Sequence, residues 1–321
     1  MILVTGATGF VGKALVQRLM AANVYPQTAV ALRSAGAWQW PENVLPLVTG
    51  DLLPGSDWSE ALKGISVVVH CAARVHMMTD KAANPLDDFR RVNVQGTLNL
   101  ARQAARSGVQ RFVFISSIKV NGEATKLGVP FCADNISAPL DPYGISKMEA
   151  EQGLRELSAQ TAMEVVVIRP PLVYGPGVKA NFHTMMHWLK RGVPLPLGAI
   201  HNRRSLVAID NLVDLIVTCV THPAAANETF LVSDGEDLST TQLLHRMGHA
   251  LRRPAVLVPV PASIVEWGAA LIGKSDLAQR LCGSLQVDIL KTRQMLGWTP
   301  PISVDQGLQK AAEGYLRETA V

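Results

Sequence analysis

Short apolar runs alternate with longer amphipathic stretches through the first half of the chain. Runs rich in Val, Ile and Leu are typical of buried strands, whereas apolar residues at helical spacing predict helices. Strands without polar alternation, separated by helices, predict a parallel sheet covered on both faces, which is a doubly wound α/β domain. The expected strands are Ile2–Thr5, Thr28–Leu32, Val44–Val48, Ile65–His70, Arg111–Ser116 and Glu164–Arg169, and the expected helices are Val11–Ala22, Leu86–Ser107 and Pro142–Thr161.

The alternation becomes irregular after Arg169, where proline and glycine become frequent. We therefore expect residues 1–175 to form the doubly wound domain and residues 176–321 to form mainly a smaller C-terminal lobe. Helices are expected in this lobe near Asn181–Arg191, Asn211–Thr221, Thr240–Leu251 and Val304–Arg317.

Composition limits the possible function classes. The chain has 321 residues, of which 48% are hydrophobic and 17% charged. At about 150 residues per domain this length predicts about two domains, and the apolar content excludes a disordered chain. The net charge of +4 is too small to indicate a nucleic-acid partner. No apolar stretch approaches the roughly 18 residues of a spanning helix, and the start lacks the basic leader of a signal peptide, so we expect a cytoplasmic protein without membrane insertion.

The cysteines and histidines do not form a recognisable metal site. The four cysteines lie far apart without a CxxC pair, which indicates reduced thiols rather than disulfides or zinc ligands. His183 and His187 are four residues apart, as are His245 and His249, but neither pair has an acid or cysteine close by in the sequence. We interpret them as helix-surface histidines and expect no bound metal.

A glycine-rich turn lies between the first expected strand and the first expected helix. Its glycines recur at every third position, which allows a tight turn, a close approach of backbone N–H groups to a pyrophosphate, and close packing of the helix on the sheet. An ordinary strand–helix turn is the alternative, but the position between strand and helix favours a Rossmann-type dinucleotide site. The expected cofactor contacts in this turn are Gly6, Gly9, Phe10, Val11 and Gly12.

The end of the second strand bears on which dinucleotide binds. An acid about 20 residues after the glycines would bind the 2′-hydroxyl of NAD. The strand instead ends in Arg33 and Ser34, which suit the 2′-phosphate of NADP, so we favour NADPH and keep NAD as possible. A solvated surface arginine is the alternative. Asp51 and Leu52 follow the third strand and are placed to meet the adenine ring, although Asp51 could be a plain loop residue.

Tyr143 and Lys147 are the candidate acid–base pair. Their spacing of four places both on one face of the expected helix, where the lysine cation would favour the phenolate and lower the tyrosine pKa. The pair alone could arise by chance. Ser116 and Ser117 end the preceding strand at the sheet edge where doubly wound sheets bind ligands, so Ser117 could share a substrate oxygen with Tyr143. Asn93 lies inside an expected helix, where it needs a partner, and a backbone-bonded structural role is its alternative.

These residues together resemble the extended short-chain dehydrogenase/reductases of the NAD(P)-dependent nucleotide-sugar epimerase/dehydratase group. The resemblance covers nearly the whole chain. It implies a catalytic triad of Ser117, Tyr143 and Lys147, with Lys147 also holding the nicotinamide ribose. The group commonly forms homodimers through two helices, and we expect one here. The matching segments are 5–12, 51–52, 70–73, 93–97, 116–117, 143–147 and 169–176, and the further cofactor contacts implied are Ala72, Ala73, Asn93, Ser116, Tyr143, Lys147, Pro170 and Leu172.

The C-terminal lobe resembles the nucleotide-sugar part of UDP-hexose 4-epimerases. Asn181 and Arg204 correspond to that family's diphosphate contacts, and Leu197 lies in the segment that passes the uracil. The segment after residue 282 lacks the family's second arginine, for which Arg280 is a speculative substitute. The segments 73–76 and 117–123 further resemble those of bacterial reductases of UDP-2-acetamido-4-keto-2,6-dideoxyhexose. Their candidate sugar contacts are Arg74, His76, Lys119 and Asn121. The alternative is that these are loop residues that face water.

The resemblance and Arg33 together favour one reaction. We expect NADPH-dependent reduction of the C4 ketone of a UDP-2-acetamido-2,6-dideoxy-4-ketohexose for bacterial surface polysaccharides. The alternative is a UDP-glucose or UDP-GlcNAc 4-epimerase with tightly bound NAD. A non-catalytic NADP-sensing protein on the same fold is the third hypothesis, which the intact triad disfavours.

Overall fold

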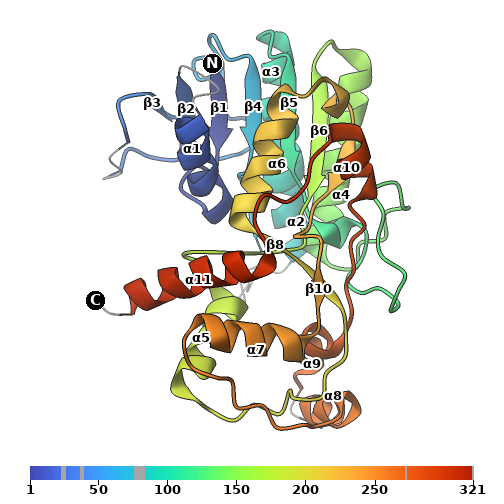
Figure 1. Cartoon of the computed structure of the whole chain (residues 1–321). Coiled ribbons are helices and arrows are strands. Elements are labelled where there is room, and N and C mark those ends of the chain that lie inside the picture. The colour runs from blue at the N-terminus through green and yellow to red at the C-terminus, as the bar shows by residue number, and fades with distance from the viewer. Residues whose placement is uncertain (23–26, 37–39, 76–83, 272, 320–321) are drawn as a thin grey trace.

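Seven strands lie side by side in one parallel sheet with the order β3-β2-β1-β4-β5-β6-β9 (Figure 1). This computed structural model describes residues 1–22, 27–36, 40–75, 84–271 and 273–319. Strand order reverses between β1 and β4, which is where ligands bind in sheets of this kind. The Rossmann-type fold is therefore confirmed. The strands are β1 (Ile2–Thr5), β2 (Thr28–Leu32), β3 (Val44–Val48), β4 (Val67–His70), β5 (Arg111–Ile115), β6 (Glu164–Arg169) and β9 (Thr229–Leu231).

Helices cover both faces of this sheet because the side chains of each strand alternate between two apolar layers. In β1, Ile2 and Val4 pack in a core with α1 and α6, whereas Leu3 packs in a second core with α3 and α4. Polar residues are scarce on these strands for the same reason. The helices of the two layers are α1 (Phe10–Ala22) and α6 (Ile209–Thr221) on one side, and α2 (Pro85–Phe89), α3 (Thr97–Arg106) and α4 (Pro142–Gln160) on the other.

The expected helix over residues 86–107 is interrupted. A π-helical segment, η1 (Arg90–Gly96), joins α2 to α3. A Cβ at Gly96 would lie 2.6 Å from the carbonyl oxygen of Leu52, so the wide turn brings this segment against the loop after β3. Such π-turns are rare and frequent at functional sites, and hydrophobic periodicity does not distinguish them from an ordinary helix.

The C-terminal lobe has its own three-stranded sheet. In it β8 pairs in parallel with β7 and antiparallel with β10. Its core is formed by the helices around this sheet. The elements of the lobe are β7 (Leu172–Tyr174), β8 (Arg204–Ala208), β10 (Asp237–Leu238), α5 (Ala180–Arg191), α7 (Thr240–Ala250), α8 (Ala262–Leu271), α9 (Ser275–Cys282) and α11 (Val304–Glu318). Two short helices follow elements of the main domain: η2 (Ile118–Val120) comes after β5, and η3 (Pro223–Ala225) comes after α6.

The chain crosses between the two parts several times, so the expected boundary at residues 175 and 176 is not a single crossing. After β8 it returns to the main sheet with α6 and β9, and α10 (Leu290–Leu296) packs on β9 through a hydrogen bond from Thr292 Oγ1 to the Leu231 carbonyl of 2.6 Å. The junction is held by the buried Asp234 carboxylate, which accepts hydrogen bonds of 2.7 Å each from the Ala208 amide, Asn211 and Tyr174.

The close packing of the first helix yields a stability prediction. A Cβ at Gly12 would lie 2.2 Å from the carbonyl oxygen of Gly6, whereas a Cβ at Gly268, also within a helix, would meet nothing within 4 Å. We expect Gly12→Ala to lower the free energy of unfolding by about 1–3 kcal/mol through overpacking. Gly268→Ala should raise it by about 0.5–1 kcal/mol. Urea denaturation of both variants measures the difference, and equal effects would contradict this packing.

Candidate active site

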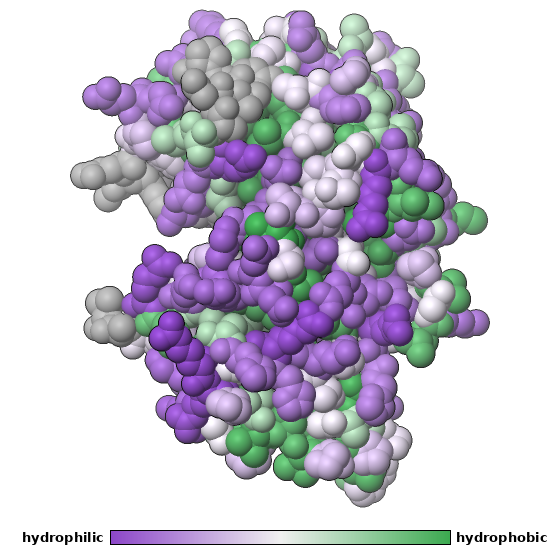
Figure 2. All heavy atoms as spheres, viewed as in Figure 1, coloured by the Kyte–Doolittle hydropathy of each residue, from purple (hydrophilic) through white to green (hydrophobic). Residues whose placement is uncertain are grey.

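The candidate site lies where the carboxyl ends of β1, β4, β5 and β6 face the C-terminal lobe. These strands run in the same direction, so the segments that follow them meet at one edge of the sheet (Figure 1). Figure 2 shows the surface hollowed between the upper domain and the lower lobe on one side of the molecule. The glycine-rich turn, Ser117 and the start of α4 are all on segments at this edge.

The glycine-rich turn has the geometry that a pyrophosphate requires. Gly6 has a φ of +67°, and a Cβ there would lie 2.7 Å from the Ala72 nitrogen. The Gly9 amide donates to the Gly6 carbonyl at 2.9 Å, and α1 begins at the next residue, Phe10. The first amides of a helix lack intrahelical acceptors and attract anions. Because side chains at these glycines would fill the turn, the residues present fit a dinucleotide.

A buried histidine links the elements beneath this turn. His70 Nδ1 lies 2.8 Å from Thr5 Oγ1, and Nε2 lies 2.9 Å from Thr97 Oγ1. Burial, assisted by the Lys147 charge, lowers the pKa of His70 to about 3. The imidazole is therefore neutral at physiological pH and ties β1, β4 and α3 together. The segment 70–73 is predicted only by the family resemblance, because one histidine carries no periodic signal.

The remaining predicted cofactor residues lie around the same edge. Arg33 is exposed directly after β2, and Asp51 is exposed beside the partly buried Leu52 in the loop after β3. Ala73 follows Ala72 on the segment after β4. Pro170 is buried after β6, whereas Leu172 is exposed at the start of β7. The topology brings these residues to one side of the sheet, and their contacts with a cofactor stay predictions.

Local chain signals place the predicted acid–base pair at the start of α4. Asp141 caps the helix by accepting a hydrogen bond of 2.6 Å from the Gly144 amide, and Pro142 occupies the first turn. Tyr143 is partly buried and lies edge-on to Phe89 with ring centroids 6.1 Å apart. Lys147, one turn later, is buried and donates a hydrogen bond of 2.8 Å to the Ile115 carbonyl at the end of β5.

The expected acidification of Tyr143 by Lys147 is wrong for this structure. Burial, and secondly the negative charge of Asp141, raise the pKa of the Tyr143 phenol above its ordinary value. The Lys147 ammonium instead hydrogen-bonds to the strand and lies 4.4 Å from the centroid of the Phe114 ring. The phenol is therefore protonated near neutral pH in the free protein and, without a ligand, does not act as a base.

The pKa of Lys147 lies well below the ordinary value of a lysine. Burial lowers the lysine pKa to about 8, while Cys71 and Glu151 act in the opposite direction. The ammonium has three donors, of which Ile115 takes one, so it keeps hydrogen-bonding capacity toward a ligand. Cys71 beside it is no candidate nucleophile, because burial raises its thiol pKa to about 12.

The two serines after β5 differ in what their hydroxyls contact. Ser117 is partly buried, and its Oγ accepts a hydrogen bond of 3.3 Å from the Lys119 amide. Ser116 is buried, and its hydroxyl donates to Glu151 Oε1 at 2.5 Å. The Ser116 hydroxyl is therefore directed into the protein, and a contact of Ser116 with a cofactor stays a prediction.

A buried ion pair that the sequence pattern does not predict lies below the site. Arg169, at the end of β6, binds Glu151 on α4 in a bidentate manner at 2.6 and 2.9 Å, and both side chains are almost fully buried. The pair connects β5, β6 and α4 through Ser116. The available signal was the position of Glu151, four residues after Lys147 on the same helix, together with an arginine at a strand end.

Asn121 belongs to this buried network rather than to a sugar site. Its side-chain oxygen accepts from Arg169 at 2.9 Å, and its nitrogen donates to the Cys132 carbonyl at 3.0 Å. Both ends of the amide are thus used inside the protein, and the predicted sugar contact is wrong. Lys119 is partly exposed and ion-paired with Asp141, so it remains a candidate contact beside Tyr143.

Asn93 has the structural partners that its place in a helix requires. It accepts from the Arg74 amide at 2.8 Å and donates to the Arg74 carbonyl and to Ser146, each at 3.0 Å. It thereby holds the segment after β4 against α4, as its structural alternative predicted. The Arg74 side chain pairs with Asp88 at 3.3 Å. The predicted contact His76 lies outside the described residues.

Two arginines in the C-terminal lobe form a candidate anion site. Burial, and then the like charge of Arg280, lower the pKa of Arg204. Arg204 starts β8 and donates to the Gly283 carbonyl at 3.0 Å, whereas Arg280 is exposed on α9. Two neighbouring guanidinium groups suit a diphosphate, and the role of Arg280 as a substitute for the family's second arginine stays a prediction. Asn181 is exposed in the first turn of α5.

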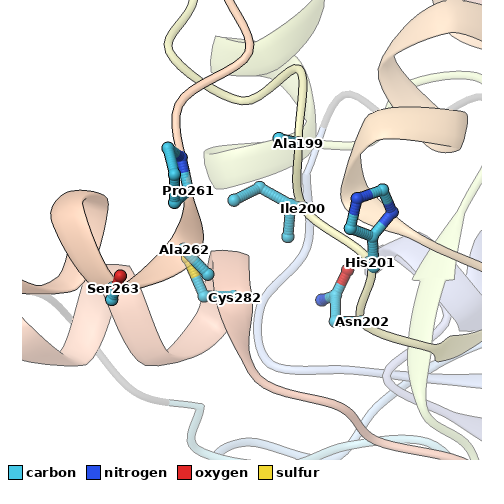
Figure 3. Close-up of a pocket in the computed structure, with 8 residues that line it drawn as sticks. All are labelled: Ala199, Ile200, His201, Asn202, Pro261, Ala262, Ser263 and Cys282. Carbon is cyan, nitrogen blue, oxygen red and sulfur yellow. The ribbon is translucent and has the colours of Figure 1, made fainter.

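A cavity of about 560 Å³ is lined by residues that are close in sequence to these arginines. It is lined by the loop 199–202, the start of α8 and Cys282 at the end of α9 (Figure 3). Pro261 and Ala262 face Ile200 across it. The buried Leu197 lies two residues before this loop, and its carbonyl accepts from Thr241 Oγ1 at 2.6 Å. The cavity is thus a feature of the C-terminal lobe, and Tyr143 does not line it.

Comparisons with known proteins agree with this geometry. The model of the NAD dependent epimerase/dehydratase family matches residues 2–233. The chain is 49% identical to UDP-glucose 4-epimerase of Vibrio cholerae over 98% of its own length and 95% of the relative. Its fold is similar to UDP-glucuronic acid 4-epimerase from Bacillus cereus in complex with NAD, with a TM-score of 0.79, 20% identity and coverage of 98% and 96%. It is also similar to Thermotoga maritima UDP-glucose 4-epimerase with UDP-glucose, with a TM-score of 0.76, 23% identity and coverage of 100% and 99%.

The buried ion pair yields a matched stability test. Glu151→Gln leaves the Arg169 charge buried without its carboxylate, and we expect it to lower the free energy of unfolding by about 3–5 kcal/mol. Glu60, whose pair with Lys63 is exposed, provides the control. Glu60→Gln should change the free energy by less than about 1 kcal/mol. Denaturant titration measures both, and a small effect at Glu151 would contradict its structural role.

Lys147 yields a pH prediction. The ammonium is the ligand-binding form, so dinucleotide affinity should fall by up to about tenfold per pH unit as pH rises above about 8. Isothermal titration across this range measures it, with Lys147→Met expected to bind weakly and without that slope. Equal slopes of dinucleotide affinity against pH for both proteins would exclude Lys147.

The same lysine affects stability. Because its pKa in the folded protein lies below the ordinary value of 10.5, the free energy of unfolding should rise as pH rises from about 8 to 10.5.

Proposed function

Because the chain belongs to the NAD dependent epimerase/dehydratase family, we propose that it interconverts the C4 epimers of a UDP-hexose. The observation that carries this proposal is the 49% identity to UDP-glucose 4-epimerase of Vibrio cholerae, which extends over nearly the full length of both chains. It favours the alternative from the sequence over the expected reduction of a UDP-4-keto-2,6-dideoxyhexose. The third hypothesis, a non-catalytic sensor, has no support in these comparisons.

The chain's own residues fit a bound nicotinamide dinucleotide. When bound, that group supplies the acceptor and donor for the hydrogen at C4. The turn formed by Gly6, Gly9 and Gly12 would hold its pyrophosphate, since its backbone packs too tightly to carry side chains at these positions. Lys147 would hold the ribose with the donors that Ile115 leaves free.

Proton transfer is assigned to Tyr143. Removal of hydride from C4 must be matched by removal of the hydroxyl proton at O4, and return of hydride by return of that proton. The partly buried phenol would carry this proton, with Ser117 donating a hydrogen bond to the same oxygen. Because burial, and secondly the charge of Asp141, raise the pKa of the free phenol, the Lys147 ammonium and a bound ligand must offset them before the tyrosine can act as a base.

The arginine pair supports a nucleotide diphosphate as the binding handle. Arg204 and Arg280 lie close enough to shift a pKa, although like charges repel. A diphosphate between them would remove this repulsion and accept hydrogen bonds from both guanidinium groups. Binding energy at this remote group would then position the hexose, which must present both faces of C4 in turn.

One observation favours a second candidate. Arg33 and Ser34 are both exposed at the end of β2, where a 2′-phosphate would lie, and no acid occupies this position. This arrangement supports NADPH, which a net reductase of a UDP-4-keto sugar would consume and exchange. An epimerase, by contrast, returns each hydride and needs no added reductant.

The test uses the purified full-length protein and UDP-glucose. We expect formation of UDP-galactose without added reductant, and a Tyr143→Phe variant that is slower by about 10²–10⁴-fold in kcat while dinucleotide binding persists. The nucleotide that copurifies is identified in the same preparation. A Tyr143→Phe variant with normal turnover would exclude the acid–base assignment.

The same assay separates the two candidates. Protein that is inactive on UDP-glucose but oxidises NADPH with a UDP-4-keto sugar would overturn the epimerase proposal and establish the second candidate. In that case Arg33→Asp should weaken NADPH binding without a matching loss of NAD binding.

A further inference from the structure

The C-terminal lobe presents an apolar helix to the surface. α8 has no buried residue in the structure. Ile264, Trp267 and Leu271 are spaced three and four residues apart, so they share one face, and they are 56%, 67% and 68% exposed. Val265 and Ala262 attach the opposite face to the core of the lobe. Large apolar side chains gathered in this way mark an interaction surface.

The exposed face of α8 continues onto its neighbours. We define the apolar tip as the patch formed by Val256, Val258, Ile264, Trp267, Leu271 and Leu277, each at least 43% exposed. Figure 1 shows α8 at the end of the lobe farthest from the seven-stranded sheet, and Figure 2 shows apolar side chains gathering at that end. The tip is therefore a projecting surface that a flat partner can reach.

The charge around the apolar tip identifies the kind of partner. Residues 250–277, which include the tip, contain three basic residues and two acidic ones. Arg252, Arg253 and Lys274 are exposed, and Lys274 follows α8 directly, where its amide donates to the Ala269 carbonyl at 2.8 Å. Glu266 is the acidic residue on α8 itself. An apolar face bordered by cations is complementary to anionic lipid headgroups above acyl chains.

We propose that the apolar tip docks on the surface of an anionic lipid bilayer. Ile264, Trp267 and Leu271 enter the boundary between headgroups and acyl chains, while Arg252 and Lys274 contact lipid phosphates. A second copy of the chain is disfavoured as the occupant, because docking tip to tip would bring like charges together. The proposal does not depend on the reaction at Tyr143.

The length of α8 determines how it meets the bilayer. Ten residues span about 15 Å, which is half of the roughly 30 Å hydrocarbon core. In the part of the chain that the structure describes, no helix is long and apolar enough to cross a membrane. The tip therefore lies in the interface. Docking would bring the membrane beside the cavity of Figure 3, which Pro261, Ala262 and Ser263 line next to the start of α8.

Vesicle sedimentation with the full-length protein tests this proposal. Wild-type protein should bind vesicles of equimolar phosphatidylcholine and phosphatidylglycerol more tightly than vesicles of phosphatidylcholine alone, and less tightly at high salt. Leu271→Ser should weaken binding roughly tenfold, because one large apolar side chain no longer enters the bilayer. Leu127 is 62% exposed in the loop before α4, outside the tip, and Leu127→Ser is the matched control that should bind as wild type does.

A charge variant tests the second half of the proposal. Arg252→Glu with Lys274→Glu should abolish the preference for anionic vesicles, and circular dichroism checks that each variant is folded. The proposal is overturned if wild-type protein stays in the supernatant or if Leu271→Ser and Leu127→Ser bind equally. It is also overturned if Leu271→Ser only converts a dimer to a monomer in analytical ultracentrifugation and leaves vesicle binding unchanged.

Discussion

The ion pair between Arg169 and Glu151 is the contact on which the geometry of the site depends. It joins the end of β6 to α4, and Ser116 adds the end of β5 to it. Tyr143, Lys147 and Glu151 lie on successive turns of α4, so a carboxylate anchored below the helix determines where the phenol and the ammonium stand. A buried pair contributes little net stability compared with apolar packing, but it specifies one arrangement because an unpaired buried charge is costly.

Burial has opposite consequences for the titratable groups around the pair. It holds the His70 imidazole neutral, lowers the pKa of Lys147 and raises the pKa of Tyr143. Each shift favours the uncharged form, as expected when water is removed from an ionisable group. A cofactor and a substrate that bring their own charges and hydrogen bonds would alter these balances, which makes the chemistry of the site conditional on binding.

The doubly wound sheet could be predicted because each of its first six strands is a continuous apolar run, and those runs alternate with helices. β9 was not predicted, because its three residues carry no period and their place beside β6 depends on a long return of the chain. The π-helical segment at Asn93 and the short helices α8 and α9 were not predicted either, for similar reasons. Local pattern reports burial on a helix or strand, but not which distant segment completes a layer.

The candidate site divides in the same way. Spacing and position in the sheet found Tyr143, Lys147, Ser117 and the glycines, since these depend on neighbouring residues. Asn121 was misassigned because its partner, Arg169, is remote in sequence. The direction of the Tyr143 pKa was also misjudged, because a spacing of four residues says nothing about the depth of burial. Pairwise motifs therefore identified the chemical groups, while the network that orients them required coordinates.

The account depends most on hydride leaving and returning to one carbon of the sugar. This is tested directly by incubating the purified protein with UDP-glucose that carries deuterium at C4 and analysing the product by mass spectrometry and NMR. The account predicts UDP-galactose that retains the deuterium at C4 in the absence of added reductant. UDP-galactose without deuterium at C4, or no conversion by protein that carries a dinucleotide, would contradict it.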